Sequence, residues 1–76
     1  RSATCKALAA KHDLTEREFD VLVKLSRGQS VADISSELGV SENTAKTHIK
    51  NVYRKLGVHS KQDIIEMCRE MEARKS

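Results

Sequence analysis

The sequence contains no proline and no tryptophan, and Phe19 and Tyr53 are its single phenylalanine and tyrosine. Strands are enriched in aromatic and β-branched residues, whereas Ala, Leu, Lys and Glu favour helices. Because the second group is abundant, the composition disfavours a sheet and predicts an all-α fold. The 76 residues suit one small domain with a thin hydrophobic core.

Long apolar runs are also missing. A transmembrane helix needs about 20 consecutive apolar residues, and no run here exceeds a few. The start of the chain does not resemble a signal peptide. We therefore expect a cytoplasmic location and no membrane contact by this part of the protein. The chain begins with Arg1 rather than Met, which suggests a fragment cut from a longer protein.

Cysteine and histidine patterns of known sites are absent. Cys5 and Cys68 lie far apart in the sequence and form neither a disulfide framework nor a CxxC site, so we expect two reduced thiols. His12, His48 and His59 match no familiar zinc spacing. No nucleophile–base pair can be argued from spacing, and so small a domain offers no deep pocket. The sequence predicts no metal, no cofactor and no enzymatic activity.

Negative charge is missing from one window. Residues 43–62 contain five Lys or Arg and no Asp or Glu, whereas acidic and basic residues nearly balance on both sides. The net charge of +3 therefore comes from this window. A local basic surface indicates an anionic partner.

Capping signals divide the chain into helices. Thr15 and Glu18 form a capping-box pattern, and glycine tolerates the left-handed conformation that ends a helix. The predicted helices cover residues 16–27, 31–38, 42–56 and 61–74, after the caps Thr15, Ser30, Ser41 and Ser60 and before the stops Gly28, Gly39 and Gly57. Residues 1–13 form a linker or a short leading helix with Leu8 as core candidate, and residues 14–76 form the domain.

The segment "ELGVS", residues 37–41, joins the second and third of these helices. So tight a turn containing glycine favours a steep crossing of two helices rather than an antiparallel pair. This is a helix-turn-helix arrangement, in which the second helix can enter the major groove of DNA.

The helix at 42–56 is two-faced. At about 100° per residue, one stripe is apolar and faces the core: Ala45, Ile49, Val52 and Leu56. The opposite side is polar and free of carboxylates: Asn43, Lys46, Thr47, Lys50 and Arg54. Such a surface can neutralise phosphates and donate to base edges. We expect base contacts from Lys46, Thr47 and Lys50, and phosphate contacts from Thr44, Asn51, Arg54 and Lys61.

The motifs "LTERE", "ADISSELGVS", "SENTAKTH" and "KLGV" together resemble the LuxR-type helix-turn-helix domain found at the C-terminus of LuxR, NarL, FixJ and GerE regulators. The resemblance covers about residues 14–70. It implies a four-helix domain whose third helix reads DNA, with Lys46, Thr47 and Lys50 at the family's base-contacting positions. Three residues depart from the family pattern: Ala45 for Val, Ser35 for Ala, and Lys61 for Arg. The first two thin the packing of neighbouring helices, and the third loses the bidentate guanidinium.

The last helix is a candidate dimer interface. The resemblance implies that this helix often supports dimerisation. Its apolar residues also occupy more of the helix circumference than packing on one core requires: Ile64, Ile65, Cys68 and Met71. The alternative is that the leading helix around Leu8 covers them. The expected partners are double-stranded DNA, a second copy of the chain when bound, and RNA polymerase.

Two other functions fit parts of the pattern. Region four of a sigma factor also carries a helix-turn-helix with a similar "S-x-x-T" segment, although a full last helix favours the LuxR type. A helical protein-interaction module with an incidental basic face belongs to a different class. The primary hypothesis is the C-terminal effector domain of a bacterial transcription regulator that binds specific DNA sequences.

Overall fold

The computed structural model describes residues 2–75 and contains five helices with no strand among them. They are α1 (Ser2–Lys11), α2 (Glu16–Ser26), α3 (Val31–Leu38), α4 (Glu42–Leu56) and α5 (Lys61–Lys75). The predicted all-α helix-turn-helix fold with a short leading helix is confirmed. None of the helices in this part of the chain is long and apolar enough to cross a bilayer.

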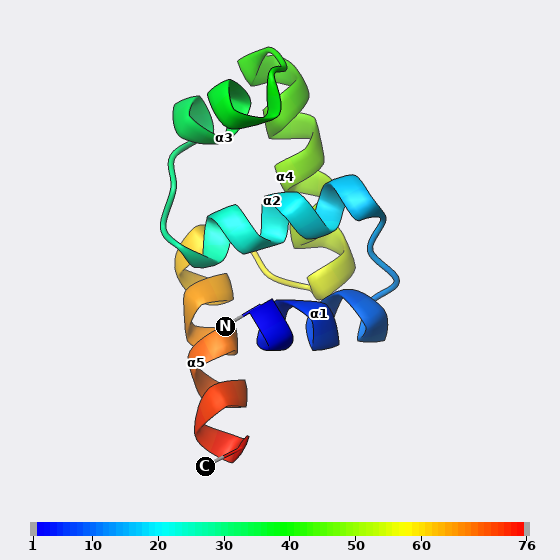
Figure 1. The fold of residues 1–76 in the computed structure, drawn as a ribbon, viewed down its shortest axis with the longest axis vertical. Helices are drawn as coiled ribbons and strands as arrows, with labels where there is room; N and C mark the ends of the chain where they lie inside the picture. Colours follow the sequence, from blue (N-terminus) through cyan, green and yellow to red (C-terminus); the bar gives the residue numbers. More distant parts are fainter. Residues whose placement is uncertain (1, 76) are drawn as a thin grey trace.

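The helices form an elongated body of 38 × 21 × 20 Å. In Figure 1, α4 and α5 follow the long axis, while α2 and α1 cross it one below the other. The central helix is α2, which packs against α4, α5 and α1, whereas α3 packs mainly against α4. One long side of α4 therefore stays uncovered.

The core draws residues from all five helices, with Leu22, Ile34, Val52 and Ile64 each 0% exposed. Within α2, Val21, Leu22 and Leu25 are all buried, because three helices pack against α2. Phe19 is half-buried. Phe19 packs at the edge of this core.

The predicted capping residues lie where their side chains can bond. Thr15 Oγ1 accepts a hydrogen bond from Glu18 N at 3.1 Å, and Glu18 Oε1 accepts one from Thr15 N at 2.9 Å. Ser30 and Asp33 form a second capping box. These bonds satisfy N–H groups that the first turn of a helix would otherwise leave open. The helix starts are thus fixed locally.

Candidate nucleic-acid interface

The turn between α3 and α4 sets the direction in which α4 leaves. Gly39 adopts φ +70°, a left-handed conformation that glycine takes without steric cost. Val40 N then donates to Ser35 O at 3.0 Å, which closes the end of α3. The next residue is Ser41, whose Oγ accepts from Thr44 N at 3.1 Å and caps α4. The crossing of α3 and α4 is therefore set by three consecutive positions, Gly39, Val40 and Ser41.

The inner face of α4 rests on α2 and α3. The predicted stripe is confirmed, since Ala45, Ile49, Val52 and Leu56 are all buried. Ser35 of α3 is also buried, and its hydroxyl donates to Ala32 O at 2.9 Å. A buried hydroxyl is costly only without a partner, so serine is accommodated at this position.

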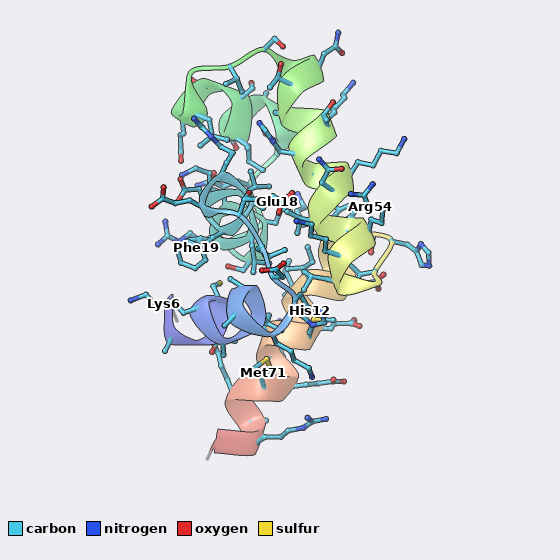
Figure 2. The ribbon with its side chains drawn as sticks, turned by 90° about the vertical axis from the view of Figure 1, so that its right-hand side faces the viewer. Lys6, His12, Glu18, Phe19, Arg54 and Met71 are labelled. Carbon is cyan, nitrogen blue, oxygen red and sulfur yellow. The ribbon has the colours of Figure 1, made fainter. Side chains whose placement is uncertain are left out.

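The outer face of α4 is exposed and positively charged. Lys46, Lys50 and Arg54 are exposed, and none of them forms an ion pair or hydrogen bond with another residue in the range 2–75. Figure 2 shows Arg54 pointing away from the body, on the side opposite Lys6 and Phe19. These three cations are uncompensated, and we call them the free cations.

The hydroxyls of Thr44 and Thr47 differ in the hydrogen bonds that they remain free to make with a partner. Thr47 Oγ1 donates to Asn43 O at 3.1 Å, so its hydroxyl hydrogen is used within the helix. Its methyl and its oxygen lone pairs remain. Thr44 Oγ1 accepts from Ser41 Oγ at 3.0 Å, which leaves its own hydrogen free to donate. Thr47 is thus equipped for an apolar or acceptor contact, and Thr44 for a donor contact with an oxyanion.

Lys55 belongs to the acid-free window but points inward. Its Nζ lies 2.8 Å from Glu18 Oε1 and donates to Asp13 O at 3.3 Å. The hydrogen bond from Lys55, reinforced by that from Thr15 N, lowers the pKa of the Glu18 carboxyl below its ordinary value. Figure 2 places Glu18 between α2 and α4. Lys55 therefore fixes α4 against α2.

Lys61 is also occupied within the chain. Its Nζ donates to Gly28 O at 3.1 Å and to Gln29 O at 3.3 Å, just beyond the C-terminus of α2. A cation there is stabilised by the carbonyl end of the helix dipole. The predicted phosphate contact of Lys61 would have to share the ammonium with these carbonyls. Asn51, the other flanking position, is half-buried.

The four predicted dimer residues divide into two pairs. Ile64 is 0% and Cys68 8% exposed, and both belong to the core. Ile65 and Met71 are half-buried. Helix α1, the predicted leading helix, packs on α5. It therefore covers much of the apolar surface of α5 that was expected to form a dimer interface. A homodimer through α5 stays a prediction, and Ile65 and Met71 are the members of the set that a partner could reach.

Two hollows of the surface lie between α1 and α5, and neither is lined by a residue of α4. Within the described part of the chain no three His, Cys, Asp or Glu side chains converge as a metal site would require. The outer face of α4 is therefore an exposed helix surface that neither hollow touches. Such a surface suits contact with a groove of a large partner rather than enclosure of a small molecule.

The comparisons with known proteins agree with this geometry. A family model described as "Bacterial regulatory proteins, luxR family" matches residues 12–68, which include α2, α3 and α4 and about half of α5, up to Cys68. The chain belongs to the LuxR family. No solved structure matches it significantly.

The LuxR-family match establishes the general activity. A domain of this family binds DNA in transcription regulators, and the helix-turn-helix formed by α3 and α4 is the matching structural unit. The predicted family and the predicted fold class are confirmed. Which side chains of this LuxR-family domain touch bases, and whether two copies bind together, are matters for proposal.

The Glu18–Lys55 pair generates a prediction for stability against pH. The pKa of Glu18 is lowered in the folded chain from an ordinary value of 4.5. Its contribution is therefore complete above about pH 4.5 and is lost as pH falls through the folded pKa. We expect Glu18→Gln to lower the free energy of unfolding by about 1 kcal/mol at pH 7, with the deficit shrinking on acidification.

Urea unfolding of the wild type and the variant at several pH values measures this difference. Glu16→Gln is the matched control, because Glu16 lies in the same first turn but is exposed. Equal losses in the two variants, or a Glu18→Gln deficit that persists unchanged at pH 3, would show that the ion pair is not the cause.

Proposed function

We propose that this LuxR-family domain binds specific double-stranded DNA by placing α4 in the major groove. One observation carries the proposal: the free cations Lys46, Lys50 and Arg54 share an exposed face with no carboxylate partner among the described residues. An α-helix fits the major groove. Phosphates on either side would supply the counter-charges that the protein itself does not.

The contact roles follow from position along α4. Residues near the start of a recognition helix reach base edges, and later ones meet the backbone. Lys46, Thr47 and Lys50 are the proposed base contacts, with Thr47 offering its methyl to a thymine. Arg54, one turn beyond Lys50, is proposed for a phosphate. Thr44 and Asn51 flank the face and are also proposed for phosphates.

Lys61 and α5 are proposed to make further contacts, with a phosphate and with a second chain. Lys61 would reach a phosphate while it stays close to the carbonyls beyond α2. Homodimerisation on DNA would use α5 through Ile65 and Met71, which keep some exposure. A transcription regulator bound in this way would also meet RNA polymerase. The protein-interaction module is less well supported, because such a module gives no reason for three adjacent uncompensated cations.

The salt dependence of binding tests the DNA interface as a whole. With Arg54 and Lys61 as the cations assigned to phosphates, log K against log[salt] should have a slope of roughly −2 per bound chain. Arg54→Ala should reduce the steepness by about 1. Lys6→Ala is the matched control, since Lys6 is exposed on α1 and lies on the opposite side of the molecule (Figure 2). Fluorescence anisotropy with a labelled duplex gives these slopes.

Affinity that does not change with salt, or a Lys6→Ala effect as large as that of Arg54→Ala, would contradict binding through α4.

Sequence discrimination tests the base contact of Lys50. A site selected from random DNA serves as the cognate duplex, and a scrambled duplex as the competitor. Lys50→Ala should weaken cognate binding by about 1–3 kcal/mol, because a donor to a base edge is lost. Scrambled DNA should be affected much less. Equal losses on both duplexes would reassign Lys50 to the backbone.

A further inference from the structure

The two cysteines, which the sequence places near opposite ends of the chain, meet in the folded protein. Cys5 of α1 is 2% exposed and Cys68 of α5 is 8% exposed, and both belong to the core. Together they line one cavity of about 250 Å³ between α1, α2 and α5. Cys5 Sγ also donates to Ser26 Oγ at 3.6 Å.

The contact between α1 and α5 holds the two thiols in the same place. Thr4, next to Cys5, is 3% exposed and its hydroxyl donates to Glu72 Oε2 at 3.4 Å. Leu8, one turn further along α1, is 3% exposed. The cysteines are thus held in place by packing on both helices. Holding two reacting groups together in this way raises their effective concentration for each other.

We propose that Cys5 and Cys68 are an oxidation site at which a hydroperoxide, such as hydrogen peroxide, produces an intramolecular disulfide between α1 and α5. The exposed Arg69 and Glu72 also line the cavity, so an oxidant of this size has a path from the surface. Both thiols are free in the structure. The inference is independent of the DNA-binding proposal.

The reaction balances in two steps. With hydrogen peroxide, one thiolate attacks an oxygen, the O–O bond breaks, and a sulfenic acid forms, while the departing hydroxide takes up the proton lost by that thiol and becomes water. The second thiolate then attacks the sulfenic sulfur, so that the S–S bond forms and the S–O bond breaks with release of a second water. Two thiols thus lose two electrons to one peroxide, and both thiol protons end in water.

The environment of Cys68 makes this reaction slow at neutral pH. Burial, together with the neighbouring Cys5 thiol, raises the pKa of the Cys68 thiol to about 11. Since only the thiolate attacks, the pair stays reduced at low oxidant and responds when the oxidant is abundant. The bond would link two helices that are distant in the sequence, which strongly constrains the unfolded chain.

Peptide mapping of the full chain after peroxide treatment, at about pH 8.5 to increase the thiolate fraction, tests the site. We expect a single cross-linked peptide pair containing Cys5 and Cys68, the loss of both alkylatable thiols, and reversal by dithiothreitol. The melting temperature of the oxidised monomer should rise by roughly 10 °C or more.

Cys5→Ser and Cys68→Ser are the controls, and each should keep its melting temperature unchanged by peroxide. The wild-type peptide map decides the matter even where a variant folds poorly. Sulfinic acid at either cysteine without a cross-link would overturn the proposal, as would disulfides only between chains. Thiols that stay unreactive until denaturant is added would overturn it as well.

Discussion

The ion pair between Glu18 and Lys55 ties the C-terminal half of α4 to the start of α2, and the rest of the scaffold is arranged around this contact. Glu18 Oε1 accepts hydrogen bonds from Thr15 N and from Lys55 Nζ. One buried carboxylate therefore caps the start of α2 and fixes the C-terminal half of α4. Lys55 also donates to Asp13 O, in a turn where Asp13 takes the left-handed φ of 56°. Three segments of the chain meet at these two side chains.

The charges of the acid-free window divide by what the fold does with them. Lys55 and Lys61 bind groups of the chain itself, at the start of α2 and just beyond its end. Lys46, Lys50 and Arg54 bind none within residues 2–75. Lys55 and Lys61 stabilise the packing of the helices around α2. Lys46, Lys50 and Arg54 are exposed on the outer face of α4. A polyanion is the natural counterpart of the second group, in keeping with the LuxR-family assignment.

The features that could be predicted from the sequence are those fixed by local chemistry. The capping residues Thr15, Ser30 and Ser41 each bond within their own first turn, so their spacing was sufficient to place helix starts. The inner stripe of α4 likewise follows from helix periodicity. Lys55 and Lys46 lie at about the same angle from the buried stripe of α4, on opposite sides of it, so helix periodicity alone did not show that Lys55 turns inward to Glu18 while Lys46 stays exposed.

The features that the sequence did not predict depend on contacts between distant segments. Lys61 has no local partner, since its acceptors follow α2. The cover of α5 by the leading helix around Leu8 was one of two alternatives that the sequence left open, and choosing between them requires the path of the whole chain, as does the meeting of Cys5 and Cys68. For the same reason Ile64 and Cys68 looked available to a partner, although the fold of a single chain already buries them.

Backbone amide shifts of the ¹⁵N-labelled chain, followed during titration with a selected duplex, show directly whether DNA binds through α4. We expect the largest changes on α4 between Asn43 and Arg54, with smaller ones at the turn before it. Amides of α1 should change little, and those near Ile65 and Met71 of α5 should change only if two chains bind together. Large changes confined to α1 and α5, with α4 unaffected, would contradict DNA binding through α4.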